Sequence, residues 1–517
     1  MNTQAVRIQV KAKNRRPIVQ WLATLMLVGT LLLQPLVGYA QATDSVDTQP
    51  YRLFLPVAAG SDADNEVEQA EVEQAETQME AEMALSDEEQ AALDDAILNA
   101  PLPDTATVSA AAVAQLFTVT KVADTDDGLC DRDCSLREAL NAAAADPLTY
   151  DRIDLPAGLY ELSLGTLTLI NAKLIGADTK TTIITRIAGD SDLLEIPSTA
   201  PASATQQIEK VTLRNGRDAI TYMQGTLTLV SVLISNNGGD GVTGTDQAGQ
   251  LFVFNSIIEG HDTGIKLRQQ VSGHIEHSVL RKNVTGVSAR HFLMIIDSTI
   301  TQNGETGIKI REGAKATIRN SAITHNYAEG IELSNGDITI SNSTITYNAP
   351  KKVSYPDFEG KGGLVLQDGS VAHLDFVTIA SNNVSSIGAG IVVDANPRNL
   401  LVLRNSIVAN NYREDHTTAD CIGVITSAGY NLIENTAGCT ITGDTTGNIY
   451  GQDPKLGRLM APKGSPAHYV PAQTSPVIDV IPAEQCGQVN IDQRYLSRPR
   501  DGNKDRVALC DIGSTER

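Results

Sequence analysis

Apolar residues recur through the middle of the chain at intervals of about 22 residues, a period typical of solenoids. Successive copies read "NSIIEGHDTGIKL", "HSVLRKNVTGVSA", "DSTITQNGETGIKI" and "NSAITHNYAEGIEL". Each copy holds short runs of alternating apolar and polar residues, which predict β-strands, with Gly or Asn at the expected turns. The apolar residues that mark the copies are Leu213, Leu233, Ile258, Leu280, Ile300, Ile323, Ile345, Ile379 and Val408.

Three short strands per period predict an all-β parallel β-helix, in which each copy forms one coil. We expect the β-helix to span residues 151–450 in eleven or twelve coils, counting less regular copies at both ends. Leucine-rich repeats share the period, but their Leu-x-x-Leu-x-Leu frame is absent.

Asparagines stand three residues after most markers, and stacked amides can bond to one another as in other stacked sheets. They are Asn236, Asn283, Asn303, Asn326, Asn348, Asn382 and Asn411, with His261 interrupting the series. Asn also tolerates left-handed backbone at a turn. We expect a structural ladder here and not a binding stripe, and we give the glycines before the next strand the same interpretation.

The segment "CDRDCSLREALNAAAAD" predicts a helix that closes the N-terminal end of the coil within residues 116–150. Ser135 and Glu138 form a capping box, and Leu136, Ala139, Leu140 and Ala143 give one apolar face. Open sheet edges at the ends of a repeat array need such caps. We expect residues 451–517 to form a second capping module.

The N-terminus has the layout of a secretory signal peptide, which we assign to residues 1–42. Basic residues precede an apolar run, and Ala40-Gln41-Ala42 follows as a small-x-small cleavage pattern. An uncleaved anchor is the alternative that the short apolar run disfavours. We expect a secreted or extracellular protein that has no membrane span once the signal peptide is cleaved.

Export favours disulfides over thiol chemistry for the six cysteines. Pairing by proximity predicts Cys130–Cys134, Cys421–Cys439 and Cys486–Cys510. Zinc binding at Cys130 is disfavoured because no histidine or second cysteine pair stands at ligand spacing.

The formal net charge of -22 is concentrated in residues 43–115, which have no Lys or Arg after Arg52. This acidic segment has few bulky apolar residues, so we expect a disordered linker without a face to bury. The acidity excludes nucleic acid as a partner, because binding its backbone needs clustered cations.

Cys134-Ser135-Leu136-Arg137-Glu138-Ala139 resembles the motif of the CSLREA domain, found in exported bacterial β-helix proteins. At the other end, "DPKLG", "SPVID", "DQRYLSRPRDG" and "CDIGSTE" resemble the choice-of-anchor Q domain. The resemblance implies a right-handed β-helix of the pectate-lyase-like fold, usually without an assigned activity. Tyr495 departs from this pattern, since the family generally has glycine there. Because no tail resembling a sorting signal precedes Arg517, we expect release and not attachment.

Outward positions after the turn glycines predict a cationic face across three coils. Its residues are Lys266, Arg268, Arg290, Lys309 and Arg311, with Glu332 in the following coil. Arg can grip a carboxylate through two bonds, so this face suits an acidic polysaccharide. The alternative is a solvated surface on which the cations lie against acidic neighbours.

His325 and Tyr347 share one register position on adjacent coils and form a second candidate, an acid–base pair for β-elimination, with Arg290 and Arg311 as further catalytic candidates. The simpler interpretation, which we favour, makes His325 and Tyr347 turn residues beside the asparagine ladder. No Gly-His-Gly or Asn-Thr-Asp motif of the polygalacturonase type is present.

We expect no metal or other cofactor, although aspartates in residues 123–128 and 500–505 could hold calcium. The lone histidines His274, His277, His291 and His373 are expected on the surface or in polar coils. Phe252, Phe254, Met294 and Ile296 make both faces of their coils apolar, so we expect the chain's own loop or a partner to cover them.

These patterns predict an exported protein that binds polysaccharide or another cell-exterior surface, without identified catalytic residues. The alternatives are a polysaccharide lyase or epimerase that acts on an acidic glycan, and a purely structural or adhesive rod.

Overall fold

The computed structural model describes residues 87–103, 113–187, 190–245, 247–349, 360–384, 389–413, 417–487 and 489–517. All of them belong to the compact unit Tyr51–Arg517. The predicted signal peptide, most of the acidic segment and most of the long insertion after Asn348 lie outside the described residues. No helix in the described part of the chain is long and apolar enough to cross a membrane.

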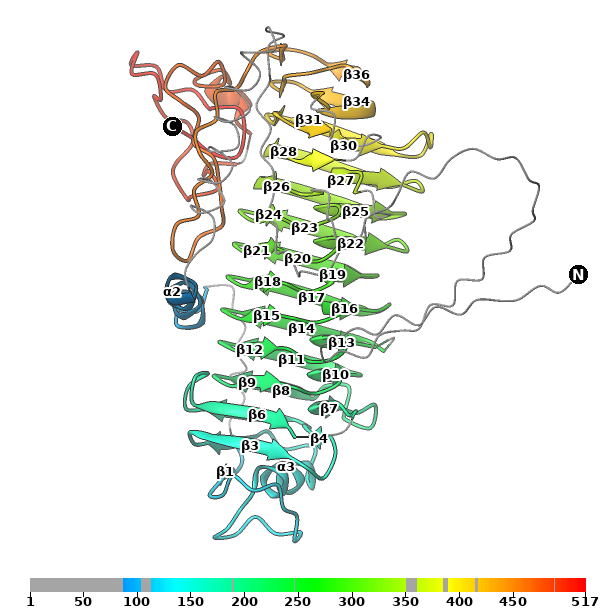
Figure 1. The fold of residues 1–517 in the computed structure, drawn as a ribbon, viewed down its shortest axis with the longest axis vertical. Coiled ribbons are helices and arrows are strands. Elements are labelled where there is room, and N and C mark those ends of the chain that lie inside the picture. Colours follow the sequence, from blue (N-terminus) through cyan, green and yellow to red (C-terminus); the bar gives the residue numbers. More distant parts are fainter. Residues whose placement is uncertain are drawn as a thin grey trace, which may run out of the picture. The chain divides into compact units, whose positions relative to one another are not determined.

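The chain winds into a right-handed parallel β-helix, as the period predicts (Figure 1). Each coil contributes three strands, and each strand pairs in parallel with its equivalent in the next coil. The coil of β17, β18 and β19, for example, stacks on that of β20, β21 and β22. Three columns of strands result.

The first column is β1 (Leu116–Thr118), β2 (Asp151–Leu155), β5 (Ala172–Gly176), β8 (Thr205–Glu209), β11 (Gly225–Val230), β14 (Gly249–Phe254), β17 (Val271–Glu276), β20 (Phe292–Ile296), β23 (Lys315–Arg319), β26 (Asp337–Thr346), β28 (Val371–Ala380), β31 (Leu400–Arg404), β34 (Cys421–Ala428) and β36 (Cys439–Asp444).

The second column is β3 (Gly158–Leu162), β6 (Thr182–Arg186), β9 (Thr212–Arg214), β12 (Leu233–Ser235), β15 (Ile257–Glu259), β18 (Val279–Arg281), β21 (Thr299–Thr301), β24 (Ala322–Thr324), the second halves of β26 and β28, β32 (Ile407–Ala409), β35 (Leu432–Ile433) and β37 (Ile449–Tyr450).

The third column is β4 (Leu167–Thr168), β7 (Leu194–Ile196), β10 (Ile220–Tyr222), β13 (Val242–Gly244), β16 (Thr263–Leu267), β19 (Thr285–Ala289), β22 (Ile308–Arg311), β25 (Ile331–Ser334), β27 (Gly362–Gln367), β30 (Ala389–Val393) and the start of β34. Among the described residues it stacks eleven strands, in line with the expected number of coils. β29 (Asn383–Val384) and β33 (Tyr412–Arg413) pair separately.

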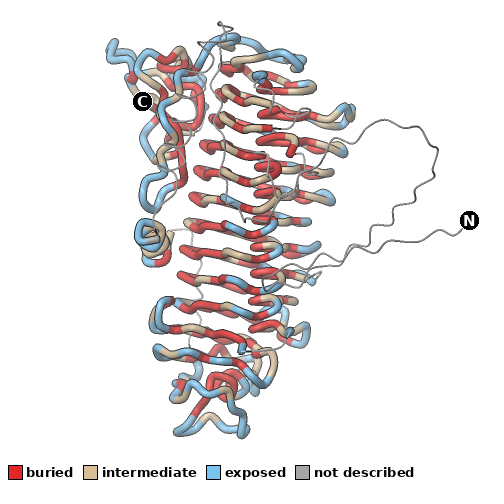
Figure 2. The backbone as a smooth tube through the Cα atoms, in the orientation of Figure 1, coloured by how far each residue is buried: buried red, intermediate tan, exposed pale blue. Residues whose placement is uncertain are grey.

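The core lies inside the coils, where alternate side chains of all three columns meet (Figure 2). Ile275, Leu280 and Val287 of one coil are fully buried. Their partners one coil further are Ile295, Ile300 and Ile308, which are also fully buried. Burying each such side chain contributes about 1.5–3 kcal/mol relative to exposure. Aliphatic residues at one position per coil therefore specify the stack.

The predicted asparagine ladder is present, and we call it the inner ladder: Asn283, Asn303, Asn326, Asn348, Asn382 and Asn411. Nδ2 of each of the first five donates to the Oδ1 of the next asparagine over 2.8–3.2 Å, and all six residues are buried. His261 continues the ladder with Nδ1 3.0 Å from Asn283 Oδ1. These amides satisfy one another within the core wall, as expected of a structural ladder.

Two details of that prediction are wrong. The residue above His261 is Asn237 and not Asn236, because Leu233 faces outward and Ile234 is the inward residue of its coil. The left-handed residue of each turn is also the one before the ladder asparagine, such as Lys282 (φ 55°) or Gln302 (φ 54°). Asn serves here through its amide and not through its backbone.

The N-terminal cap forms as predicted. Ser135 caps α3 (Leu136–Ala144), and Glu138 completes the capping box. Leu136, Ala139, Leu140 and Ala143 are buried, and the helix contacts the first strands β1, β2 and β4. The three predicted disulfides, Cys130–Cys134, Cys421–Cys439 and Cys486–Cys510, are all present.

Residues 451–517, which include the short helix η1 (Ala483–Gln485), pack along the flank of the last coils (Figure 1). Val477, Ile481 and Ile512 meet the outward apolar residues Phe376 and Ile407 of β28 and β32. Arg498 and Glu516 form a completely buried ion pair within this module. The expected C-terminal cap therefore covers the second column from outside.

The expectation that residues 43–115 have no face to bury is wrong for α2 (Asp87–Leu98). Leu98 packs on Ile257 and Val279, which face outward from the second column. Arg281 donates to both carboxylate oxygens of Asp94 over 2.6 and 2.7 Å. The segment after α2 continues along the coils, since Asn255 donates to the carbonyl of Ala100 over 2.6 Å beside the buried Phe254. A segment of the chain itself therefore lies beside Phe254, where we expected a loop or a partner to cover the coil.

Candidate functional site

The predicted cationic residues share the outward face of the third column, which we call the charged face. Strand pairing aligns Lys266, Ser288, Lys309 and Glu332 in one row, and Arg311 with Ser334 in the next. Arg268 and Arg290 follow β16 and β19, and both are exposed. Lys266, Lys309 and Arg311 lie on the outward side of their strands, the side that alternation from the turn glycines predicts.

Carboxylates pair with Lys266, Arg290, Lys309 and Arg311 of the charged face. Lys266 lies 2.7 Å from Asp240, and Arg290 lies 3.2 Å from Glu312. Lys309 lies 3.3 Å from Glu305, and Arg311 lies 3.2 Å from Glu332. The face is therefore a network of alternating charges and not a purely cationic patch. Its role in binding stays a prediction.

His325 and Tyr347 come together, but at the turn beside the inner ladder. Their rings stack with centroids 5.0 Å apart, and both have left-handed backbone (φ 56° and 52°). Burial lowers the pKa of His325 to about 4 and raises the pKa of Tyr347 above its ordinary value. Tyr469 of the C-terminal module is buried nearby and contacts Thr346. The neutral, covered imidazole fits the turn interpretation, and a catalytic role stays a prediction.

The two predicted calcium segments use their carboxylates locally. Asp124 pairs with Arg137 at 2.8 Å and accepts the backbone N–H groups of Ser163 and Leu164. Asp501 accepts the backbone N–H groups of Asp505 and Arg506. Calcium binding in either segment stays a prediction.

A cleft of about 290 Å³ that the sequence did not reveal lies between the coil and the C-terminal module. Its wall on the coil side is the turn between the first and second columns, and its other wall is formed by segments near residues 460–468 and 493–495. The lining includes His277, Asp297, Met460, Pro466, His468, Gln493, Arg494 and Tyr495. The cleft is the place where titratable groups of both parts of the chain meet.

The coil side of the cleft belongs to a column of left-handed residues, one per coil, which we call the outer column: Asn255, His277, Asp297, Asn320 and Asn342. Their φ values lie between 44° and 49°. The serines that follow them also stack, and from Ser278 onward each accepts the backbone N–H of the serine one coil earlier, as Ser278 does from Ser256 at 3.1 Å. This serine ladder holds the outer column in place.

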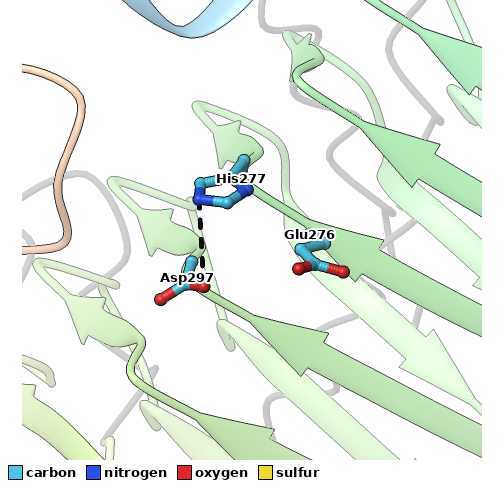
Figure 3. A group of neighbouring side chains, drawn as sticks. All are labelled: Glu276, His277 and Asp297. Atoms are coloured by element: carbon cyan, nitrogen blue, oxygen red, sulfur yellow. Dashed lines mark ion pairs between the residues drawn. The ribbon is translucent and has the colours of Figure 1, made fainter. Parts of the chain in front are cut away.

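His277 and Asp297 stand where the neighbouring coils have asparagine, and they form a compact group with Glu276 (Figure 3). His277 Nε2 lies 3.8 Å from Asp297 Oδ2, and the hydroxyl of Tyr495 donates to the same oxygen. Glu276 Oε2 lies 2.8 Å from His274 Nε2. Glu276 and Asp297 are both buried.

The group also has perturbed acidity. Burial raises the pKa of Asp297 above its ordinary value, although the Tyr495 hydrogen bond opposes this shift. Burial and the adjacent carboxylate raise the pKa of Tyr495. On the opposite wall burial lowers the pKa of His468. Groups with shifted pKa in a cleft are candidates for a functional site, and this one can exchange protons or hold a cation.

Sequence reasoning set His274 and His277 aside as lone histidines and noted Tyr495 only as a departure from a family pattern. The signal that could have found the group is the outer column itself. At one position per coil Asn gives way to His and Asp in two consecutive coils and then returns. The contact between Asp297 and Tyr495 spans 198 residues of sequence, so the repeat period does not predict it.

Residues 283–452 match the family described as right handed beta helix region. No curated protein matches the sequence. Among solved structures, the A-module of the Azotobacter vinelandii mannuronan C-5 epimerase AlgE6 is similar at 15% identity, with 62% of this chain and 94% of that chain covered and a TM-score of 0.45. The pectate lyase Pel9A is similar at 13% identity, with 79% and 98% covered and a TM-score of 0.38. The catalytic unit of a GH87 alpha-1,3-glucanase from Streptomyces thermodiastaticus is similar at 14% identity, with 68% and 72% covered and a TM-score of 0.33.

Proposed function

We propose that this protein is an exported β-helix that binds polysaccharide through the charged face. The observation that carries the proposal is the register of that face: one row on four successive paired strands holds Lys266, Ser288, Lys309 and Glu332. Such a row repeats once per coil, at about 4.8 Å. A surface that repeats along a rigid scaffold suits a ligand that itself repeats, as a polysaccharide does.

The ion pairs refine the kind of ligand. A uronate carboxylate would have to compete with Asp240, Glu305, Glu312 and Glu332 for the cations. Side chains held in ion pairs still present N–H donors and carboxylate oxygens to sugar hydroxyls, and their mutual contacts preorganise them. The charge balance therefore favours recognition of hydroxyl groups over neutralisation of a charged sugar, and it disfavours a lyase at this face. Export is supported by the three disulfides, which persist in oxidising compartments.

The test is co-sedimentation of the purified protein with insoluble neutral and acidic polysaccharides, with absorbance of unsaturated products followed in parallel. We expect binding to at least one neutral glycan, with weak dependence on salt because the face carries little net charge. The double substitution Arg290→Ala and Arg311→Ala should weaken binding about tenfold or more, which is about 1.4 kcal/mol.

The double substitution Lys315→Ala and Arg319→Ala is the matched control, because both residues are exposed on β23 in the first column and their loss removes the same two charges. Absence of binding across the panel would refute the proposal and leave the structural rod. Release of unsaturated product that the double substitution abolishes would instead establish a lyase.

A further inference from the structure

We propose that Glu276, His277 and Asp297 form a binding site for a divalent transition-metal cation, with Zn²⁺ the ion that suits them best. One imidazole nitrogen and two carboxylate oxygens of these residues lie within 4.8 Å of one another (Figure 3). Glu276 and His277 come from the end of β17 and the turn after it, and Asp297 follows β20 in the next coil. The inference does not depend on polysaccharide binding at the charged face.

Two buried atoms of this group point to a missing partner. Asp297 is 6% exposed, its Oδ2 accepts from Tyr495, and the Asn320 side chain interacts with its carboxylate, while Oδ1 makes no hydrogen bond of ordinary length among the described residues. Nδ1 of His277 is also buried and without a partner in that part of the chain. Leaving a buried polar atom unpaired costs about 1–3 kcal/mol. A cation bound to Asp297 Oδ1 would satisfy that oxygen.

The scaffold holds the three side chains with little freedom. The backbone N–H of His277 donates to Ile296 O at 3.2 Å, and that of Asp297 donates to Arg319 O at 3.1 Å. His274 Nε2 lies 2.8 Å from Glu276 Oε2 and fixes the orientation of that carboxylate. Partners of this kind orient metal ligands and tighten binding. Ligands on rigidly paired strands are therefore preorganised.

The donor set selects the ion. Zn²⁺ binds imidazole nitrogen and carboxylate oxygen at about 2.0–2.2 Å, whereas Ca²⁺ takes six to eight oxygen ligands. A histidine nitrogen in a set of three favours the transition metal. Three protein ligands leave a fourth tetrahedral position for a water or another ligand. His277 and Asp297 line the cleft, together with Arg494 and His468.

The experiment is calorimetric titration of the chelator-treated full-length protein with ZnCl₂, with CaCl₂ as a second titrant. We expect one Zn²⁺ per chain with micromolar or tighter affinity and much weaker Ca²⁺ binding. His277→Ala and Asp297→Asn should each weaken Zn²⁺ binding by about a hundredfold. Co²⁺ should give the visible absorption of a tetrahedral site in the wild type and lose it in both variants.

His291→Ala is the matched control, since His291 is exposed in the next coil and should leave the affinity unchanged. Tyr495→Phe should retain the site, because it removes a hydroxyl that donates to Asp297 and leaves all three ligand side chains in place. Thermal unfolding of each variant distinguishes loss of a metal-binding side chain from loss of the folded structure. Because His277 is half-buried, its substitution should disturb the core least. Zn²⁺ binding that is equal in wild type and His277→Ala, or Ca²⁺ binding tighter than Zn²⁺, would overturn the proposal.

Discussion

Two columns of turn residues run along the β-helix, and they use asparagine in opposite ways. In the inner ladder each asparagine is buried and bonds to its own kind one coil away. In the outer column each side chain meets a different group: Asn255 meets Ala100, Asp297 meets Tyr495, and Asn342 meets Ile491. The same residue type at the same period therefore builds a wall in one corner and a contact surface in the other.

The two columns differ in the partner that each side chain needs. A ladder amide needs an amide above and below it, so a substitution breaks bonds in three coils. The side chain of an outer-column residue interacts only with the segment that packs against it, so the residue type can differ from coil to coil. His277 and Asp297 are ionisable residues in consecutive coils of the outer column. All six residues of the inner ladder, in contrast, are asparagines. Chemistry can therefore appear in a repeat where neighbours in the stack do not constrain one another.

The sharpest way to break the comparison is Asn326→Ala in the inner ladder. Asn326 Oδ1 accepts from the backbone N–H and Nδ2 of Asn303 at 3.2 and 2.8 Å. Its Nδ2 donates to Asn348 Oδ1 at 2.9 Å and to Ile300 O at 3.1 Å. Truncation leaves these buried groups unpaired around a cavity, so we expect a loss of about 2–4 kcal/mol in the free energy of unfolding. Denaturant unfolding measures it, and a loss below about 1 kcal/mol would show that the ladder is dispensable.

The end of the inner ladder gives the next effect, a pH dependence. Asp420 Oδ1 accepts from Asn411 Nδ2 at 2.8 Å, where the next asparagine would stand. Burial raises the pKa of Asp420 to about 7. The folded pKa exceeds the unfolded value of about 3.9, so the stabilisation is complete below pH 4 and is lost as pH rises through 7. We expect the protein to be less stable at pH 8 than at pH 5, with Asp420 contributing on the order of 2 kcal/mol.

Asp420→Asn separates this group from the other buried carboxyls. Burial also raises the pKa of Glu516 to about 7 and of Asp511 to about 6, so part of the slope should survive the substitution. Denaturant unfolding of both proteins at the two pH values gives the comparison. A slope that Asp420→Asn leaves unchanged would place the titration elsewhere.

Local patterns predicted most of the fold. The repeat period predicted the coil, and strand alternation predicted the charged face. The capping box predicted α3, and the sequence proximity of the cysteines, together with the expected export, predicted the disulfides. Each of these signals lies within one or two coils of sequence. One error, Asn236 for Asn237, arose because Leu233 is an outward apolar residue covered by α2, and periodicity does not show which apolar residue faces inward.

The cleft could not be predicted because it depends on contacts between distant segments. Asp94 meets Arg281 across 187 residues, and Asp297 meets Tyr495 across 198. A period tells which residues share a column, but not which segment from outside the repeat will cover that column. Ion pairing of the charged face was an alternative that the sequence left open, but its particular partners could not be predicted, since Glu312 and Glu305 stand in the turns between strands and outside the rows that alternation tracks.

The smallest expected effect sharpens the comparison from the outer side. Asn255 donates to Ala100 O at 2.6 Å, while its Oδ1 has no partner in the described residues, and its φ is 49°. Glycine accepts this backbone conformation without strain, so Asn255→Gly removes little more than one hydrogen bond. We expect a global loss within about 1 kcal/mol, together with faster hydrogen exchange confined to residues 87–103. Asn326→Ala should reverse that pattern, with a large global loss and no selective change in α2. If Asn255→Gly cost as much as Asn326→Ala, the two columns would be equivalent supports, and the freedom we assign to the outer column would be lost.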